Sequence, residues 1–447
     1  MTQPPMAAGT RGASRVLSVD LLRGLDVFLM LFVNEIAGVH GTPAFLKHVG
    51  ADADGMTITD IVFPAFLFLT GMAIPLALGG RLRRGEPRAQ IWRHVLLRTL
   101  ALLVIGVFMV NAEESGGAGV LPPPIWTIVM TIGVILVWHR IERGDRAPRA
   151  AADASTQRKS NASRETSRDR GAPDAPATIN AWIPWAIGVA ILIALALLYR
   201  EAGASGAFQM RPRWWGILGL IGWAYLVAAT VYLRTGDHPF ALLGVTALLY
   251  CVALADHAGQ LAWLSAAGAF ISVGSVLGSH GAITVSGAVL TALLIRHRES
   301  GRPPSTFLWP AAAYAAGLGA AALLLHGLHA LHPAFFYNKI HATVPWSLMS
   351  SAWTAAAFVI VFAIVDLAGW RRWPPSIAMA GENALITYLM APFLLAIFGL
   401  LELLTGVNPY AALGRDTVVG FIRSALFAWV VIRLCGWIRA RGLRVQI

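Results

Sequence analysis

The sequence predicts an all-α integral membrane protein with about twelve transmembrane helices and both termini in the cytoplasm. Hydrophobic residues make up 57% of the chain and charged residues only 13%. The mean hydropathy is +0.64. Apolar runs of about twenty residues, the length that crosses the hydrocarbon core of a bilayer, recur from one end of the chain to the other. This composition excludes an ordinary soluble domain.

The apolar runs divide into twelve predicted spans. The first is expected to stay as a membrane anchor, because charges open it and it has no small-x-small cleavage site. The segment 256–277 is only moderately apolar, and it is interpreted either as a loop or as an interfacial or re-entrant helix. The predicted spans are 17–38, 58–79, 92–111, 120–138, 182–200, 214–233, 239–255, 278–296, 307–326, 352–370, 377–404 and 417–437.

A polar segment separates the spans into two blocks. Residues 139–181 are rich in Arg, Ala, Ser, Asp and Thr and have almost no large apolar side chain. Such a segment cannot bury enough apolar surface to fold, and we expect a disordered cytoplasmic linker. It joins an N-terminal block of four spans (1–138) to a C-terminal block of eight spans (182–447).

Arginine marks the side of the membrane on which each loop lies. Arginines crowd the loops at 80–93 and 296–305, which the positive-inside rule assigns to the cytoplasm. The expected location is a multi-pass position in the inner membrane of a cell, with the lipid bilayer as partner. The net charge of +12 comes from these loops and not from one basic face, so a nucleic-acid partner is not expected.

The first two spans carry polar side chains that a lipid-facing helix does not need. Asp20 and Arg23 are three residues apart and can pair. Arg23 and Asn34 are eleven residues apart, which returns them to nearly the same face of a helix. The loop that follows carries His48, and Asp60 lies just inside the second span. Charged and amide side chains inside spans are candidates for function by default.

This block resembles the catalytic domain of the heparan-α-glucosaminide N-acetyltransferase family, including its bacterial members. The family motif R-x-x-S-x-D-x-x-R-G, then V-N, then K-H, and finally G-x-T-x-x-D-x-V-F-P is present in order over about sixty residues. Later segments around Asn338–Lys339 and 379–393 are also similar to the family. The matching residues of the first block are Arg15, Ser18, Asp20, Arg23, Gly24, Val33, Asn34, Lys47, His48, Gly55, Thr57, Asp60, Val62, Phe63 and Pro64.

The resemblance implies a transmembrane acetyltransferase. It would move an acetyl group from cytoplasmic acetyl-CoA, its cosubstrate, to a small periplasmic glycan or amino sugar. Histidine suits the general base or acyl carrier, and an amide can donate hydrogen bonds to the thioester oxygen. The expected catalytic residues are His48, Asn34 and Asp60; Arg23 and Asp20 would bind the cofactor, and His280, Asn338 and Lys339 would bind the acceptor.

Other interpretations of the same residues stay open. His48 can be a solvated loop residue, Asn34 a helix cap, and Asp20 with Arg23 a structural ion pair. Asp60 can simply hold the outer loop. The His326, His329 and His332 spacing resembles a metal site, but the side chains drift around a helix and no Cys or second carboxylate completes a tetrahedral set, so no metal is expected. A transporter of amino sugars or glycan fragments is the alternative function, a purely structural protein fits poorly, and a homodimer is left open.

Overall fold

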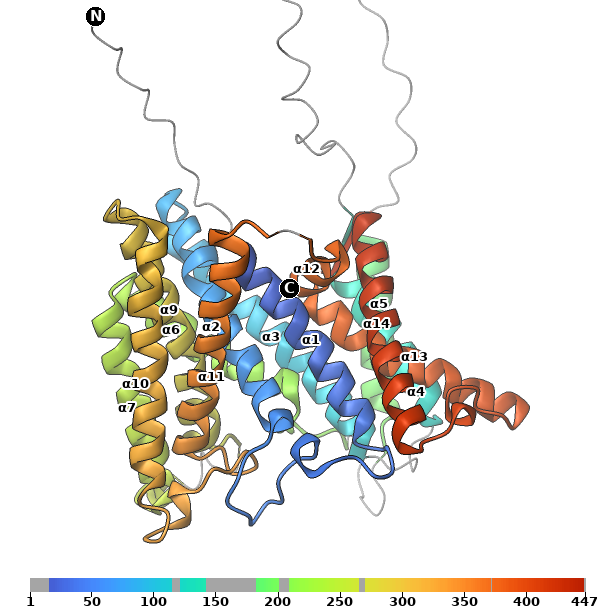
Figure 1. Ribbon diagram of the computed structural model, residues 1–447. Helices are drawn as coiled ribbons and strands as arrows, with labels where there is room; N and C mark the ends of the chain where they lie inside the picture. Colours follow the sequence, from blue (N-terminus) through green and yellow to red (C-terminus); the bar gives the residue numbers. More distant parts are fainter. Residues whose placement is uncertain are drawn as a thin grey trace, which may run out of the picture.

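The chain is described here by a computed structural model that covers residues 16–114, 121–141, 182–200, 209–264, 270–370 and 372–445. Over these ranges it is a bundle of helices with one short pair of strands (Figure 1). The helices are α1 (Leu17–Ile36), α2 (Ile58–Arg83), α3 (Arg88–Glu114), α4 (Pro123–Trp138), α5 (Trp182–Leu198), α6 (Ile217–Thr235), α7 (Pro239–His257), α9 (Gly281–Glu299), α10 (Leu308–His326), α11 (Val344–Phe362), α12 (Pro375–Glu382), α13 (Ala384–Thr405) and α14 (Thr417–Ala440).

Shorter helical segments extend or connect these helices. Two are π-helical: η3 (Val273–His280) continues directly into α9, and η6 (Ala363–Leu367) extends α11. The others are single 3₁₀ turns in the loops, namely η1 (Ala44–Leu46), η2 (Ala262–Leu264), η4 (Pro304–Phe307), η5 (Pro333–Phe335) and η7 (Ala411–Leu413).

Twelve of the described helical segments account for the predicted spans. Nine are long and apolar enough to cross a membrane. The helices α4 and α5 are apolar but shorter. The twelfth, α1, carries four charged residues and nevertheless runs through the middle of the bundle (Figure 1). The prediction of an all-helical, multi-pass membrane protein is confirmed.

Close backbone contacts hold α1 to α12, because glycines lie at the crossing. A Cβ atom built on Gly24 would collide with the carbonyl of Ile377, and one on Gly381 would collide with the carbonyl of Asp20. Small residues let helix backbones approach in this way, which strengthens packing where lipid supplies no hydrophobic driving force. The contact brings α12, a helix of only eight residues, onto the first turns of α1.

The structure differs from the predicted spans at two places. The predicted span 352–370 begins eight residues earlier, at Val344, because Ser347, Ser350 and Ser351 are fully buried inside the bundle and not exposed to lipid. Hydropathy alone therefore underestimates the length of this helix. The predicted single span 377–404 is interrupted at Asn383, whose backbone leaves the helical region (φ −115°, ψ 39°), and α12 and α13 are separate helices.

The predicted linker begins with an ordered strand. His139–Ile141 (β1) pairs in antiparallel fashion with Leu443–Val445 (β2), so the end of α4 is joined to the segment after α14. The disordered-linker prediction was therefore wrong for these three residues, because their backbone groups find a partner far away in the sequence. The rest of the predicted linker, 142–181, lies outside the described residues.

Helices α2 and α9 cross with two glycines between them. A Cβ atom on Gly71 would collide with the carbonyl of Thr284, and one on Gly287 with the carbonyl of Phe68. Gly71 therefore allows the close packing of α2 against α9. Gly71→Val should therefore lower the yield of folded protein sharply, because backbone atoms cannot move aside as a flexible side chain would. Gly80→Val on the same helix is the control, since only the end of the Arg84 side chain lies near that site. Equal size-exclusion profiles for the two variants would contradict this packing role.

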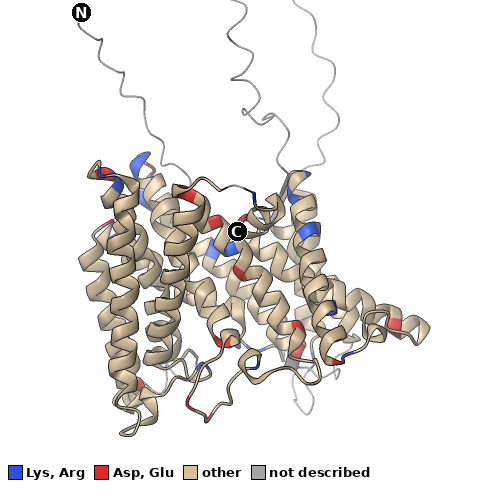
Figure 2. Cartoon of the chain, viewed as in Figure 1, with Lys and Arg blue, Asp and Glu red and all other residues tan. Residues whose placement is uncertain are grey.

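The two ends of the bundle carry different side chains. Lys and Arg gather at the upper end in Figure 2, around the end of α2, the start of α3 and the end of α9; we call this the arginine face. The opposite end, the histidine face, consists of the loops 37–57, 327–343 and 406–416 (Figure 1). The first and last described residues both lie at the arginine face. That placement fits termini on one side of the membrane, with the cytoplasmic side still a prediction.

Thiol labelling can test this orientation. In a Cys251→Ser background, His48→Cys should react with an impermeant maleimide in intact cells, because the histidine face is expected outside. Arg88→Cys, at the start of α3, should react only in inverted vesicles. Cys435 is buried and should stay silent in both preparations. The reverse labelling pattern would invert the proposed topology.

Candidate active site

A histidine and a carboxylate form the centre of the histidine face. His48 Nδ1 lies 2.7 Å from Asp60 Oδ1. The Asp60 side chain is 1% exposed and that of His48 is 42% exposed, so a buried acid holds an accessible imidazole. A carboxylate only accepts hydrogen bonds, and Nδ1 must therefore carry the proton. The lone pair of the neutral ring is then on Nε2, where a substrate can meet it.

Local structure at the start of α2 holds Asp60 in place. Asp60 is the third residue of the helix, and its Oδ2 accepts hydrogen bonds from the backbone N–H groups of Thr57 (3.1 Å) and Val49 (3.3 Å). Carboxylates in the first turn satisfy N–H groups that have no partner inside the helix. The backbone of Asp60 is fixed as well, because its carbonyl accepts a hydrogen bond from the indole N–H of Trp346 (3.2 Å). The Asp60 carboxylate therefore holds the outer loop and orients His48 at the same time, so the two interpretations of Asp60 are compatible.

Lys339 brings a third charged group to the imidazole. Its Nζ is 3.3 Å from Nδ1 of His48 and 3.4 Å from Nε2. The ammonium is therefore almost equally distant from the two ring nitrogens of His48. Burial lowers the pKa of Lys339, and the nearby Asp60 carboxylate partly opposes that shift. The structure thus brings the predicted acceptor-binding residue Lys339 into contact with the predicted catalytic residue His48.

The loop that carries Lys339 is fastened to the loop that carries His48. Asn338 donates from Nδ2 to the carbonyls of Ala51 (2.6 Å) and Ala53 (3.1 Å). Asp54 accepts a hydrogen bond from the backbone N–H of Tyr337 (2.8 Å) and pairs with Nε2 of His326 (2.9 Å). Asn338 is 3% exposed and both ends of its amide are bonded, so it positions the loop. The His326 side chain is held by its pairing with Asp54 and by stacking on Tyr337, whose ring centroid is 4.1 Å away.

His280 lies behind the site and not at the surface. It is 5% exposed, and its ring packs edge-on against Phe63 and Trp346. Among the described residues, no three His, Cys, Asp or Glu side chains gather in a way that would hold a metal ion.

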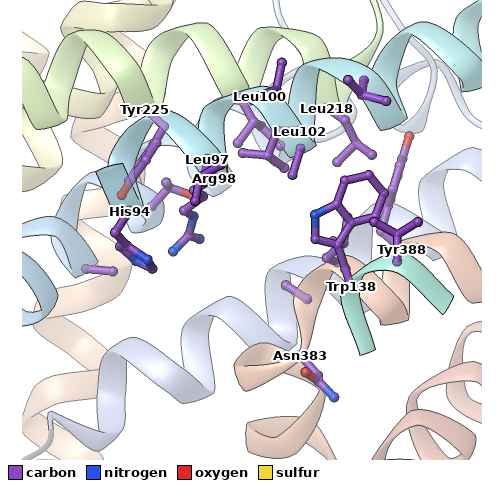
Figure 3. A pocket seen from close by; sticks show the side chains of 18 of the residues that line it. His94, Leu97, Arg98, Leu100, Leu102, Trp138, Leu218, Tyr225, Asn383 and Tyr388 are labelled. Carbon is purple, nitrogen blue, oxygen red and sulfur yellow. The ribbon is translucent and has the colours of Figure 1, made fainter. Parts of the chain in front are cut away.

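A large cavity opens on the other side of the bundle, beneath the arginine face. Its volume is about 1310 Å³, above the range of about 300–1000 Å³ usual for small-molecule pockets. Its walls come from α1, α2, α3, the end of α4, α5, α6 and the α12–α13 junction. Figure 3 shows His94, Arg98 and Tyr225 at one end and Trp138 with Tyr388 at the other. Six basic residues line it, namely Arg23, Arg81, Arg93, His94, Arg98 and His139, and the remainder of the wall is mainly apolar.

One of the two predicted cofactor residues, Arg23, lines this cavity, and the other, Asp20, lies next to Arg23. Arg23 is among its wall residues, and its guanidinium is 3.8 Å from Asp20 and 3.4 Å from the Gly381 carbonyl. The predicted Asp20–Arg23 pair is therefore present. Asn34 lies one turn beyond the wall residue Met30; it is exposed and has no hydrogen bond to another described residue.

An apolar partition separates the cavity from the His48–Asp60 site. Along α2 the cavity wall runs from Arg81 to Phe66, about 22 Å at 1.5 Å per residue, and Asp60 is about 9 Å further along the helix. The interval is filled by Met30, Val33 and Val62, which pack together. Phe32, Phe66, Ile217 and Tyr388 pack against these three side chains.

Sequence reasoning missed Arg98 and Asp54. Arg98 lies in the middle of α3, where its guanidinium stacks on the Tyr225 ring at 4.9 Å. The rule that flagged Arg23, that a charge inside an apolar span is costly, could have identified Arg98 as well. Asp54 gave no such signal, because an acidic residue in a loop is ordinary.

The fold and these two sites define a class: a multi-pass membrane protein with a large cationic cavity on one side and a His–Asp–Lys cluster on the other. Comparison with known proteins agrees with the resemblance found in the motif. The protein-family profile described as "Domain of unknown function (DUF5009)" matches residues 15–120. Heparan-alpha-glucosaminide N-acetyltransferase from Mus musculus is 34% identical over 123 residues, and that from Homo sapiens is 34% identical over 121 residues.

The similarity covers only part of each protein. The aligned stretch is 28% of this chain and 17% of the mouse protein, and 27% of this chain and 17% of the human protein. The family match includes Arg23, Asn34, His48 and Asp60, whereas Lys339 lies beyond it. The homodimer left open by the sequence finds no support in these relatives.

Proposed function

We propose that this protein transfers an acetyl group from acetyl-CoA, bound in the cavity beneath the arginine face, to an amino sugar or glycan at the histidine face. The observation that carries the proposal is the pairing of an accessible imidazole with a buried carboxylate, both within the segment 15–120 that the family profile matches. Such a pair supplies an oriented nitrogen lone pair, which is what acyl transfer to an amine needs.

The volume and the basic side chains of the cavity support binding of a nucleotide thioester. Guanidinium groups bind phosphate with two hydrogen bonds, and Arg23, Arg81 and Arg98 line one part of the wall. The Arg98 Nε–H and the Asn383 amide N–H are buried and have no acceptor among the described residues, so the wall offers unused donors. The apolar part of the wall suits the pantetheine arm and directs the thioester towards the partition.

The residues on the path of the acyl group have complementary roles. Asn34, one turn beyond Met30, would donate its amide N–H to the thioester oxygen as negative charge develops there. His48 Nε2 would either take the proton of the acceptor amine or accept the acetyl group itself. In both cases the C–S bond breaks, the C–N bond of the product forms, and CoA leaves as the thiol or thiolate. Lys339 would orient a polar acceptor beside the imidazole, with Asn338 holding its loop.

Radiolabelled transfer across a membrane tests the proposal. Purified protein in proteoliposomes should incorporate label from acetyl-CoA supplied on the arginine side into glucosamine supplied on the histidine side. The transporter alternative rests on the same cavity and needs no thioester. Uptake of unmodified glucosamine without any labelled product would favour it and would reject the acetyltransferase.

Donor binding can be examined separately from chemistry. Arg98→Gln should weaken binding of CoA by about ten- to a hundredfold, because a hydrogen bond to a charged group contributes about 1.5–3 kcal/mol. Arg88→Gln removes a charge from the same face outside the cavity wall and should bind normally. Isothermal titration calorimetry compares the two. Equal affinities would exclude Arg98 from the donor site.

A further inference from the structure

The cavity beneath the arginine face has one edge along which its wall side chains are exposed. On α3, Leu97 and Leu100 line the cavity (Figure 3), and each is more than half exposed. On α5, Trp185 and Ile193 line the cavity and are exposed to the same degree. A side chain that lines a cavity and keeps more than half of its surface exposed lies at an edge of that cavity and not inside it. The cavity therefore opens sideways between α3 and α5, towards the hydrocarbon of the bilayer.

The two helices that border this opening are joined at their histidine-face ends. The hydroxyl of Tyr199, directly after α5, donates to the carbonyl of Asn111 on α3 (3.1 Å). The Trp126 ring packs against both Phe108 and Tyr199 there. Apart from this junction, α5 packs mainly against α4 and α3 mainly against α6, and within the described part of the chain α3 and α5 do not pack along each other. The opening is therefore a slot that is closed towards the histidine face and open towards the arginine face.

One stripe of α3 lines the slot from a charged end to an apolar end. Arg93, Leu97, Leu100 and Val104 all belong to the cavity wall. Intervals of three or four residues place them on one face of the helix. From Arg93 to Val104 the stripe is about 17 Å long at 1.5 Å per residue, close to half of a hydrocarbon core of about 30 Å. The stripe is thus as deep as one leaflet of a bilayer and carries its charge at the headgroup end.

Arg93 is available to bind an anion at that end. Its side chain is exposed, and no carboxylate among the described residues pairs with it. Gln90, one turn earlier, is also exposed and also lines the wall. Arg98 lies about 140° around the helix from Arg93 and stacks on the Tyr225 ring. The arginine at the slot is therefore separate from the arginine assigned above to the donor.

We propose that the slot binds an anionic glycerophospholipid from the arginine-face leaflet. Its phosphate lies at Arg93, and one acyl chain runs along the apolar part of the stripe, between α3 and α5. A lipid suits this site better than a soluble phosphate does. A phosphate in water would leave the apolar borders of the slot wet, whereas a lipid covers them with hydrocarbon. The inference concerns the side of the cavity and does not depend on the acetyltransferase function.

Photocrosslinking in nanodiscs tests for this lipid. Leu97 of the full-length chain is replaced by benzoylphenylalanine, and the discs contain phosphatidylcholine with a minor share of phosphatidylglycerol. Mass spectrometry of the intact protein gives the share of phosphatidylglycerol among the crosslinked lipids. That share should exceed the share in the disc by about fivefold, which is the attraction expected between one basic side chain at the membrane surface and an anionic lipid.

Two matched pairs of positions separate a lipid in the slot from lipid around the protein. Leu96 and Leu97 are both 53% exposed, but only Leu97 lines the cavity. On α5, Ile187 and Ile193 are both exposed, and only Ile193 lines the cavity. Lipids crosslinked at positions 96 and 187 should match the composition of the disc. Equal phosphatidylglycerol shares within both pairs would overturn the proposal.

Two charge variants test the contact with the headgroup. Arg93→Gln should remove the enrichment at position 97, whereas Arg88→Gln, outside the cavity wall, should keep it. Enrichment that persists in Arg93→Gln would reject the proposed phosphate contact. Excess glycerol 3-phosphate should not displace the lipid, and displacement would show that the site recognises phosphate alone. A crosslink from position 97 to a peptide of this chain would show that protein fills the slot, and it would equally reject the lipid.

Discussion

His48→Ala is expected to abolish measurable acetyl transfer while the protein stays folded. The imidazole provides the only lone pair directed outwards from the His48–Asp60 pair, and loss of a positioned base typically costs about a hundred- to ten-thousandfold in rate. The side chain is 42% exposed, so its removal leaves little cavity. The measurement is transfer of labelled acetyl to glucosamine by purified protein, next to calorimetric binding of CoA.

His40→Ala is the matched control for this change. His40 lies in the same outer loop and is exposed, and only its backbone is hydrogen-bonded. It should keep normal turnover. CoA binding should survive in both variants, because the cavity lies on the other side of the Met30–Val33–Val62 partition. Near-normal turnover of His48→Ala would show that His48 is not catalytic and would favour the transporter function.

Asp60→Asn should be nearly as damaging, although the side chain keeps its size. An amide can turn its oxygen towards Thr57 and Val49 or towards His48, but it cannot accept all three hydrogen bonds as the carboxylate does. If its NH₂ group faces the ring, Nδ1 must become the acceptor and the proton moves to Nε2, where the lone pair is needed. Turnover should fall by about a hundred- to ten-thousandfold.

The kinetic pattern distinguishes this effect from simple unfolding of the loop. A tautomer error lowers kcat with little change in KM for acetyl-CoA, whereas a displaced loop also disturbs acceptor binding at Lys339. Asp52→Asn makes the same chemical change at an exposed position of the same loop and should be silent. If Asp60→Asn is fully active, Asp60 only holds the loop, and the His48–Asp60 hydrogen bond does not contribute to catalysis.

Much of the architecture follows from local sequence alone. A span needs an apolar run of fixed length, and that property is independent of what the helix packs against. The twelve spans and the polar character of α1 could therefore be predicted, and so could the contact of Asp20 with Arg23, which a helix places one turn apart. The His48 and Asp60 positions came from a motif of about sixty residues, whose order carries information that composition lacks.

Tertiary structure decided the rest, because it depends on which helix lies beside which. The helices packed around α11 determine whether Ser347, Ser350 and Ser351 face lipid or protein, and only the burial of these serines explains why α11 begins at Val344. The contact of Lys339 with His48 joins residues 291 positions apart, and that distance in sequence leaves no local trace. Likewise, β1 is ordered only because β2 lies next to it. The sequence by itself determined that this chain crosses a membrane and carries a histidine motif at one end. Packing alone decided that a cationic cavity lies on the opposite side and that an apolar partition separates the two, since long-range contacts and not local preferences create both.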